Sequence, residues 1–340
     1  MWKKKMKISI IIPGYNCENT ISKCFESVIN QMNGNDIEII FINDGSTDKT
    51  MRVIEKYQES CEFLKVISKK NEGQGVARNV GIENASGDYV MFMDSDDFLE
   101  NNCLNFIIKE LGKNYDFYIF NWNYYNKTYV KKNILKEITI EKNEENKIEK
   151  FIEDYIYNGS EYSYGSAVWN KVYKLSIIKR NNIKFVSERE YLSEDMIFNL
   201  QYMKYINTLE ANPLIIYNYV QSNQSFKKKF YKDYFDKYLK MADWLYDYDN
   251  NEAYKIKVNL KIFEYLKTIL INVIYSPKNI KLNYKIKMIR RYIQNEYSKR
   301  SAEITIKYSN NKIDYVLSYL VKWKFSVLIY LLYSIKIKRS

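Results

Sequence analysis

Residues 88–97 of this chain read DYVMFMDSDD, an apolar stretch of strand length that ends in three carboxylates within four residues. Packing alone does not account for that ending, because unpaired buried carboxylates are costly and neighbouring like charges repel each other. In α/β proteins, ligands bind at the carboxyl ends of the strands, and hard divalent cations prefer oxygen ligands. The stretch therefore predicts a Mg²⁺ or Mn²⁺ site that holds a diphosphate, with Asp96 as metal ligand and Asp94 as a second candidate.

Apolar runs that alternate with helical patterns organise the first hundred residues. Residues 7–12, 36–42, 62–67 and 88–93 have the length and apolar character of buried strands, and amphipathic stretches lie between them. This alternation predicts an α/β fold with a Rossmann-like, mainly parallel, doubly wound sheet that binds its ligand at the strand carboxyl ends. The later segments are predicted as a strand over 115–122, helices over 144–157 and 193–205, and a basic helical extension from about residue 226.

The chain contains no histidine among its 340 residues. This composition excludes histidine-ligated zinc, nucleophile systems that use histidine, and an imidazole general base. A metal must therefore be held mainly by oxygen, because the cysteines lack the CxxC spacing of thiolate sites. We expect the cysteines to be small buried side chains in a reducing cytoplasm. They are Cys17, Cys24, Cys61 and Cys103.

The net charge of +12 is unevenly distributed along the chain. Residues 1–110 hold 13 basic and 17 acidic side chains, and the remaining residues hold 40 basic and 24 acidic ones. The basic second part favours an anionic partner, which the charge pattern leaves open between a membrane surface, a nucleic acid and a polyanionic acceptor. No recognised nucleic-acid-binding module is present, so a nucleic acid is not expected as the partner.

Residues 315–340 carry a membrane hypothesis. Aromatic and aliphatic side chains in this segment are flanked by lysines, as in helices that lie in the bilayer interface. The apolar run 325–335 is about half as long as a bilayer-spanning helix, and no secretory signal is recognised. We therefore expect a cytoplasmic location, with either peripheral contact on the inner face of the membrane or a solvated helical face.

Polar loops follow the four predicted strands in a fixed order. They are Pro13–Asn16, Asp44–Asp48, Asn71–Asn79 and Asp94–Asp97. With these motifs the chain resembles the family 2 glycosyltransferases, whose fold is of the GT-A type. The resemblance is specific over 1–100, moderate over 165–225 and absent beyond about 230. It implies a GT-A glycosyltransferase domain over 1–225, with a nucleotide-sugar-binding half (1–100) and an acceptor-side half (101–225), followed by the basic helical extension over 226–340.

The chemistry of the loops agrees with a nucleotide-sugar donor. Tyr15 offers a flat face for a nucleobase, and Asp44 can accept a hydrogen bond from the imide N–H that uracil carries. Gly45 permits close backbone approach, and Arg78 supplies planar donors to the base and ribose, whereas Asp94 faces the ribose hydroxyls. The cation neutralises the leaving diphosphate. The donor-binding set that the resemblance implies is Pro13, Tyr15, Asn16, Asp44, Gly45, Arg78, Asp94 and Ser95, with Mn²⁺ or Mg²⁺ as cofactor.

Structural interpretations stay open for several of these residues. Tyr15 could pack against the sheet, and Asp44 with the residues after it could form only a turn and a helix cap. Arg78 could be a solvated helix residue. Asp97 is either part of the acidic site or the cap of a helix that starts near Leu99.

Sugar transfer needs a base that removes the proton of the acceptor hydroxyl as its oxygen attacks the anomeric carbon. Without histidine a carboxylate is the candidate, and related glycosyltransferases use the Asp of a Glu-Asp pair at a helix start, which corresponds to Asp195. The alternative is that these acids only interact with the helix dipole. The segment 217–225 resembles one that closes over the diphosphate, but it lacks the basic or histidine residue that relatives often carry. The acceptor-side candidates are Trp169, Lys171, Glu194, Tyr219 and Ser225.

Three functions compete on these observations. The first is an inverting, metal-dependent glycosyltransferase that moves a sugar from a UDP-sugar to a hydroxyl of a glycan or lipid-linked acceptor, in bacterial surface polysaccharide synthesis such as capsule or lipopolysaccharide. The second is a sugar-1-phosphate nucleotidyltransferase, which needs a Gly-rich loop with basic residues after the first strand; 13–16 lacks that loop. The third is a non-catalytic nucleotide-sugar-binding scaffold at the membrane.

Overall fold

The computed structural model describes residues 6–32, 36–126, 129–158, 162–221, 230–277 and 279–339. The chain divides into two compact units. Unit 1 comprises residues 1–155, 161–189 and 193–222, and unit 2 comprises 156–160, 190–192 and 223–340. The functional division of 1–225 into a donor half and an acceptor half stays a prediction.

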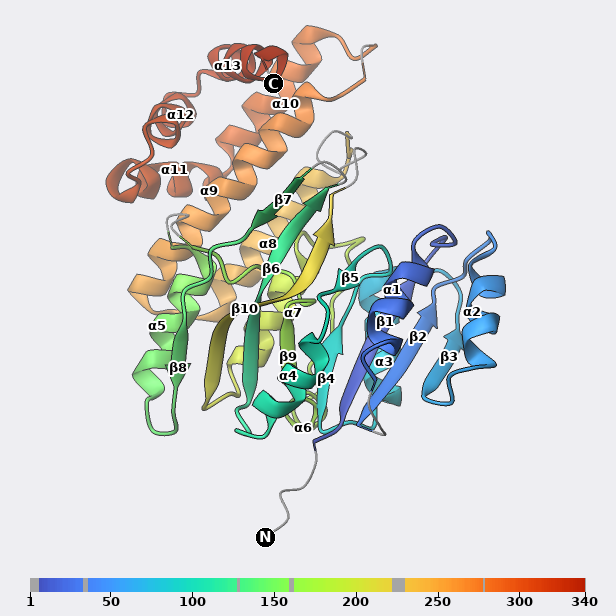
Figure 1. Ribbon diagram of the computed structural model, residues 1–340. Coiled ribbons are helices and arrows are strands. Elements are labelled where there is room, and N and C mark those ends of the chain that lie inside the picture. The colour runs from blue at the N-terminus through green and yellow to red at the C-terminus, as the bar shows by residue number, and fades with distance from the viewer. Residues whose placement is uncertain are drawn as a thin grey trace. The chain divides into compact units, whose positions relative to one another are not determined.

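A single mixed sheet forms the centre of unit 1. Its strands are β1 (Ile8–Gly14), β2 (Ile37–Asn43), β3 (Leu64–Ser68), β4 (Tyr89–Phe92), β5 (Phe98–Leu99), β6 (Phe117–Asn126), β7 (Tyr129–Lys132), β8 (Ile138–Ile140), β9 (Lys171–Lys174) and β10 (Leu209–Val220). Within the described residues their order is β3-β2-β1-β4-β9-β6-β10-β5, with β7 beside β6 and β8 beside β10 (Figure 1). The strands β3, β2, β1 and β4 are parallel, whereas β9 is antiparallel to its neighbours β4 and β6.

Helices fall between the parallel strands, as the periodicity predicts, and the predicted α/β fold with a helical extension is confirmed. The helices along this part of the chain are α1 (Ile21–Ile29), α2 (Thr50–Gln58), α3 (Gln74–Asn84), α4 (Cys103–Leu111), α5 (Glu145–Ile156), α6 (Leu175–Arg180) and α7 (Glu194–Met203). Because β1, β2, β3 and β4 are parallel, the loops after them meet at one edge of the sheet, which is the upper edge in Figure 1.

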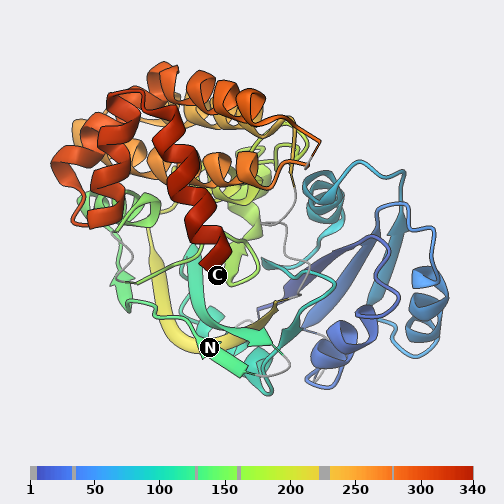
Figure 2. The ribbon, with the colours of Figure 1, turned by 90° about the horizontal axis from the view of Figure 1, so that it is seen from above.

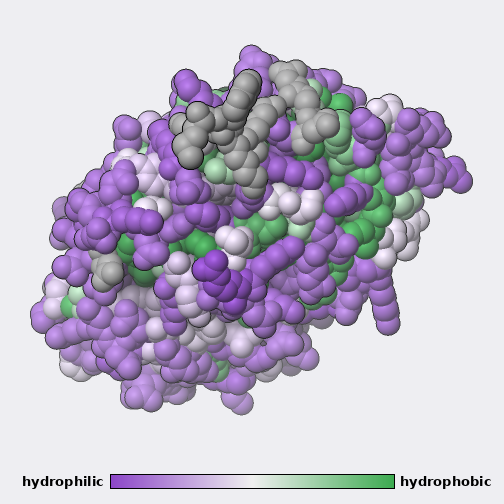
Figure 3. All heavy atoms as spheres, turned by 90° about the horizontal axis from the view of Figure 1, so that it is seen from below, coloured by the Kyte–Doolittle hydropathy of each residue, from purple (hydrophilic) through white to green (hydrophobic). Residues whose placement is uncertain are grey.

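Successive residues of a strand point to opposite faces of the sheet, and every residue of β1, β2 and β4 is buried, so both faces of these three strands are covered. Ile10 and Ile12 of β1 belong to one apolar cluster with Phe25 of α1. On the other face α3 packs closely, because a Cβ on its Gly81 would lie 2.3 Å from Cγ2 of Ile11. On the surface seen from below hydrophilic residues predominate, and apolar residues gather in a band across the middle of the view (Figure 3).

A buried carboxylate ties the opposite edge of the sheet together. Glu38 on β2 accepts hydrogen bonds from the Ser9 hydroxyl, from the backbone N–H and hydroxyl of Ser86, and from Lys65 Nζ at 2.9 Å. Burial by itself would raise the pKa of Glu38, but the bonds from Ser9, Lys65 and Ser86 outweigh it and lower that pKa to about 2. The ionised carboxylate therefore stabilises the folded chain.

We expect Glu38→Gln to lower the free energy of unfolding by about 2 to 3 kcal/mol near neutral pH. Because the folded-state pKa is depressed, the contribution of Glu38 is present above its ordinary pKa of 4.5 and is lost as the pH falls toward 2. Denaturant unfolding at several pH values measures the difference, with Glu55→Gln on the exposed side of α2 as control. A loss of equal size at every pH contradicts the explanation.

Unit 2 is helical in its described residues. Its main elements are α8 (Tyr234–Tyr248), α9 (Glu252–Ile274), α10 (Leu282–Gln294), α11 (Glu296–Tyr308), α12 (Lys312–Lys322) and α13 (Ser326–Arg339). These helices, orange to red in Figure 2, lie against one another around a core that includes Phe263, Leu270 and Ile289. None of the helices in the described part of the chain is both long and apolar enough to cross a membrane.

Candidate active site

Direct hydrogen bonds join the first two predicted loops. The backbone N–H of Asp44 donates to the carbonyl of Gly14 at 2.9 Å, and that of Thr47 donates to Oδ1 of Asn16 at 2.8 Å. Asn16 has φ of 50°, in the left-handed region, and its own N–H donates to the Ser46 hydroxyl. The ends of β1 and β2 therefore form one continuous rim.

The aromatic ring of Tyr15 stands at this rim with 51% of the residue exposed, which leaves it accessible to a planar ligand. Pro13 is buried in β1 behind it. Gly45 adopts φ of +76°, and a Cβ there would lie 2.8 Å from the backbone nitrogen of Asn71. The rim thus combines an exposed aromatic face with a close backbone approach.

Asp44 is buried next to the predicted loop 13–16 and binds the predicted loop 71–79 that follows β3. Its carboxylate accepts hydrogen bonds from the backbone N–H groups of Glu72 and Gly73, at 3.0 and 2.8 Å. Lys69 Nζ lies 2.9 Å from the same carboxylate. A carboxylate has about four lone-pair positions, so these three bonds leave acceptor capacity for a ligand donor.

The guanidinium of Arg78 connects two carboxylates that are about a hundred residues apart in the sequence. Arg78 on α3 is 1% exposed, and it donates to Asp94 Oδ1 and to Asp195 Oδ1 at 2.8 Å each. A third carboxylate, Glu194, lies 3.7 Å from the guanidinium. A buried cation with three acidic neighbours brings the loop after β4 and the start of α7 to one place. Its planar donors are directed to these acids.

The start of α7 is also tied to the start of α3. Gln74 donates through its side-chain amide to Glu194 at 2.8 Å. The backbone N–H groups of Gln74 and Gly75 donate to Glu188 at 2.8 and 3.2 Å. Glu188 was not among the predicted residues, because a single acid in the loop before α7 has no local pattern that marks it.

The pKa of the Asp195 carboxyl group is shifted into the neutral range. Burial, together with the charges of Glu194 and Asp94, raises the pKa of Asp195 to about 7, although the charge of Arg78 opposes the shift. A group that titrates near neutral pH is suited to accept a proton. The same carboxylate is oriented by its bond to Arg78, so its position is defined before any ligand arrives.

The acidic run after β4 divides into an exposed and a buried part. The Asp96 residue is exposed, but neighbouring atoms partly desolvate its carboxyl group, and this desolvation together with the charge of Asp94 raises its pKa. Asp97 is buried, and its carboxylate accepts hydrogen bonds from the Tyr217 hydroxyl at 2.8 Å and from the Val220 N–H at 2.7 Å. Ser95 is half-buried and hydrogen-bonds the thiol of Cys17.

The alternative in which Asp97 caps a helix near Leu99 is wrong. Residues Phe98–Leu99 form the short strand β5, and α4 begins only at Cys103. Asp97 instead accepts hydrogen bonds from Tyr217 and Val220 of β10. The hydroxyl of Tyr217 in turn accepts a hydrogen bond from the backbone N–H of Asp94 at 3.0 Å. Periodicity alone indicated a helix here, and pairing of β5 with β10 overrode it.

Aromatic rings form the wall next to the acidic run. The indole of Trp169 is stacked on the ring of Tyr217, with centroids 4.5 Å apart, and on that of Tyr219 at 5.7 Å. Trp169 is 7% exposed and Tyr219 is 37% exposed, so only the outer ring of this stack reaches solvent. Burial and the charges of Asp97 and Asp94 raise the pKa of Tyr219. Ser225, predicted in the same segment, lies outside the described residues.

Lys171 is buried in a cage of oxygen atoms. Its Nζ donates to the carbonyls of Tyr164, Gly165 and Ala167 and to Oδ1 of Asn170, at 2.7 to 3.0 Å. Burial lowers the pKa of Lys171 well below its usual value. With four acceptors around it, the ammonium organises the loop before β9.

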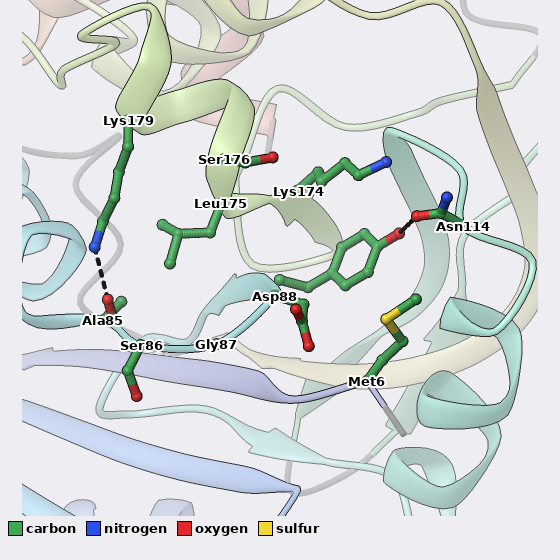
Figure 4. A pocket seen from close by; sticks show the side chains of 11 residues that line it. Met6, Ala85, Ser86, Gly87, Asp88, Asn114, Lys174, Leu175, Ser176 and Lys179 are labelled. Carbon is green, nitrogen blue, oxygen red and sulfur yellow. Dashed lines mark hydrogen bonds between the residues drawn. The ribbon is translucent and has the colours of Figure 1, made fainter. Parts of the chain in front are cut away.

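A separate pocket of about 370 Å³ opens at the other edge of the sheet, where β4 begins (Figure 4). Lys174 and Lys179 reach its border, but they bind Asp116 at 3.3 Å and the carbonyl of Ala85 at 2.7 Å. The Asp88 carboxylate there accepts a bond from the Lys7 N–H. The pocket lies at the start of β4, whereas the acidic run follows its end, so the pocket does not contribute to the candidate active site.

Comparisons with known proteins agree with this geometry. The family model for glycosyl transferase family 2 matches residues 9–175, which contain all four strand-and-loop motifs. The chain belongs to glycosyl transferase family 2. Its fold is the GT-A type, with the candidate site at the edge where the motif loops meet.

Two relatives carry glycosyltransferase names, and a solved structure shares the fold. EpsH of Bacillus subtilis, which carries the name of a glycosyltransferase, is 28% identical over 262 residues, covering 76% of this chain and 72% of EpsH. A poly(ribitol-phosphate) beta-glucosyltransferase of Bacillus spizizenii is 42% identical over 102 residues, which are 29% of this chain and 16% of that protein. S. aureus TarS 1-349, solved with UDP-GlcNAc, has a TM-score of 0.66 and 21% identity, over 98% of this chain and 92% of that one.

The oxygen cage predicts a structural role for Lys171 in this glycosyltransferase. Lys171→Met removes the donor of four buried acceptors, so we expect a loss of roughly 2 to 5 kcal/mol of unfolding free energy. Lys174→Met on the same strand removes a more exposed ion pair with Asp116, and we expect it to cost under about 1 kcal/mol. Denaturant unfolding compares the two variants, and equal losses would contradict the cage explanation.

Proposed function

We propose that this chain is a metal-dependent, inverting glycosyltransferase that moves a sugar from a UDP-sugar to a hydroxyl of a glycan or lipid-linked acceptor. The observation that carries the proposal is the bridge from Asp94 through Arg78 to Asp195. This bridge supports the proposal because the carboxylate of Asp195, the proposed base, binds the same guanidinium as Asp94 of the acidic run. Sugar transfer needs the base and the diphosphate-binding carboxylates at one site. The secondary structure of either segment alone does not require the two to meet.

The donor assignment rests on the rim at the ends of β1 and β2. Tyr15 would stack on the base, while Asp44 would accept from its imide N–H with the acceptor capacity that its three present bonds leave. Pro13, Asn16, Gly45 and Ser95 would shape the same cradle. TarS, which shares the fold, was solved with UDP and with UDP-GlcNAc. These points favour a uridine nucleotide.

The acidic run fits a divalent cation. Asp96 forms no ion pair within the described residues, and the negative charge of Asp94 acts on it, so negative charge accumulates where a diphosphate would lie. The described residues contain no set of three or more acidic or cysteine side chains that could hold a metal alone. Mg²⁺ and Mn²⁺ sites of this kind use one or two carboxylates and take further oxygens from substrate phosphates. When bound, the cation supplies charge that neutralises the departing diphosphate.

The proposed reaction assigns its steps to the chain's own residues. Asp195 takes the proton of the acceptor hydroxyl, the hydroxyl oxygen forms a bond to the anomeric carbon, and the bond to the diphosphate breaks. Attack from the side opposite the leaving group inverts the anomeric centre. Arg78 keeps Asp195 in place and favours its ionised form. Trp169 and Tyr219 would form an apolar wall on the acceptor side, with Lys171 and Glu194 holding the adjacent loops.

The cellular setting belongs to the same proposal. The four cysteines are buried free thiols, which suits a reducing cytoplasm where nucleotide sugars are available. The related poly(ribitol-phosphate) beta-glucosyltransferase is named for a polymer acceptor. We therefore place the enzyme in surface polysaccharide synthesis, with a polymer or a lipid-linked glycan as the acceptor class.

The donor and metal assignments predict that UDP binds more tightly with Mn²⁺ or Mg²⁺ than with EDTA. Asp96→Asn should remove at least about tenfold of this metal-dependent gain, because it deletes a charged ligand. Titration calorimetry with UDP, GDP and ADP measures both effects, and Glu83→Gln, an exposed carboxylate on α3, is the control. Equal binding of all three nucleotides, or a metal effect that survives Asp96→Asn, would refute the assignments.

The base assignment predicts a pH dependence of transfer. With a pKa of about 7, Asp195 loses its ionised form on acidification, so kcat/KM should fall about tenfold per pH unit below 7 and level off above it. Asp195→Asn should lower transfer by roughly a hundredfold or more and keep UDP binding. A binder without catalytic function would show the same UDP binding in both forms and no transfer in either.

Arg78 gives an independent check of the same carboxylate. Arg78→Met removes the cation that favours ionised Asp195, so the acidic limb of kcat/KM should move up by about one pH unit or more, and Arg78→Lys should move it less. Arg180→Met, on the exposed side of α6, serves as control. A limb that stays in place in Arg78→Met would show that Asp195 is not the titrating base.

A further inference from the structure

The last two helices of unit 2 have apolar side chains on more than one face. Leu317 and Val321 of α12, and Ile329 and Tyr333 of α13, are buried in the helical core. Further apolar side chains of the same helices, and of the turn between them, are exposed to solvent. We call six of these exposed residues the apolar ridge: Val316, Trp323, Phe325, Leu328, Leu331 and Ile335.

The side chains of the apolar ridge are exposed to solvent to an extent that is unusual for clustered apolar residues of one helix pair. Its members are 48 to 63% exposed, with Trp323 the most accessible. In α13 the spacing of Leu328, Leu331 and Ile335 places them along one side of the helix. A helix that is apolar on both its buried and its outward side is normally surrounded by apolar material. The outward side of α12 and α13 therefore calls for an apolar partner.

The charge around the ridge identifies that partner. Lys322 and Lys324 are exposed next to Trp323 and form no ion pair within the described residues. Residues 312–340 contain six basic side chains and a single acid, Asp314. That acid is buried and bound to Lys267 at 2.8 Å, so it adds no negative charge to the surface. Among residues 312–335, the exposed charged side chains are therefore all basic.

We propose that the apolar ridge inserts into the interface of a membrane that contains anionic lipids. Trp323 and Phe325 would lie at the level of the headgroups, leucines would reach the acyl chains, and the lysines would contact lipid phosphates. A second copy of the chain is a poorer partner. A two-fold symmetric contact through this surface would bring Lys322 and Lys324 of both copies into one interface, where like charges repel and residues 312–335 offer no exposed acid to pair with them. This surface is independent of the donor site, so the inference goes beyond the proposed function.

Flotation of the full chain with lipid vesicles tests the proposal. We expect binding to vesicles of phosphatidylglycerol and phosphatidylcholine, little binding to phosphatidylcholine alone, and weaker binding at high salt. The triple variant Trp323→Ser, Leu328→Ser, Leu331→Ser should lower the partition coefficient at least about tenfold. Lys322→Gln with Lys324→Gln should lower it about fivefold for each lysine. None of these residues belongs to the donor or base machinery, so UDP binding should stay unchanged.

Matched variants in unit 1 control for general effects. Val130→Ser with Ile134→Ser replaces apolar residues that are 53 and 69% exposed, and Lys142→Gln with Lys150→Gln removes two exposed lysines. Circular dichroism confirms that each variant is folded. The proposal is overturned if the wild type does not float with anionic vesicles, or if the control variants lose as much binding as the ridge variants. It is also overturned if sedimentation shows a lipid-free dimer that the triple variant converts to monomers while vesicle binding persists.

Discussion

One buried cation determines how the candidate site is assembled. Arg78 lies in the interior of unit 1, where an isolated charge is costly, and the carboxylates of Asp94 and Asp195 compensate it at 2.8 Å each. Removing either acid would leave the buried cation with one direct carboxylate partner instead of two. The loop after β4 and the start of α7 are therefore held together by electrostatic necessity, and the candidate base is aligned with the acidic run before a substrate binds.

The same constraint sets the proton affinity of the site. Burial makes ionisation of Asp195 unfavourable, and neighbouring acids add to this, while Arg78 opposes both. The balance leaves the pKa of Asp195 near 7 in a protein that has no histidine to fill that role. A chain without imidazole thus holds a carboxyl group with a pKa near neutral, buried beside one guanidinium, and this is the group that we propose as the base.

Buried charged groups near the Arg78 cluster hold the adjacent loops mainly through hydrogen bonds to the backbone. Asp44 fixes the loop after β3, Asp97 fixes Tyr217, and Lys171 fixes the loop before β9. Each is a buried charged group whose partners are largely backbone groups or a single hydroxyl. Such groups define one geometry, because leaving any of them unpaired is costly. The exposed members of the site, Tyr15 and Asp96, are those left free to meet a ligand.

Local sequence was sufficient for the strands β1 to β4, their loops and the helices between them, because apolar periodicity and turn residues act over a few positions. It was also sufficient to exclude histidine chemistry and to expect a basic helical extension. The partners of Arg78, the bonds of Asp97 to β10 and the cage of Lys171 are set by contacts between residues distant in sequence. The motif predicted Arg78 in the donor pocket, whereas its neighbours in the structure are the acids Asp94 and Asp195. For Asp97 the sequence left a helix cap open, and the pairing of β5 with β10 excludes that cap. Local patterns decide which segment forms, and only the tertiary fold decides which buried charges must compensate one another.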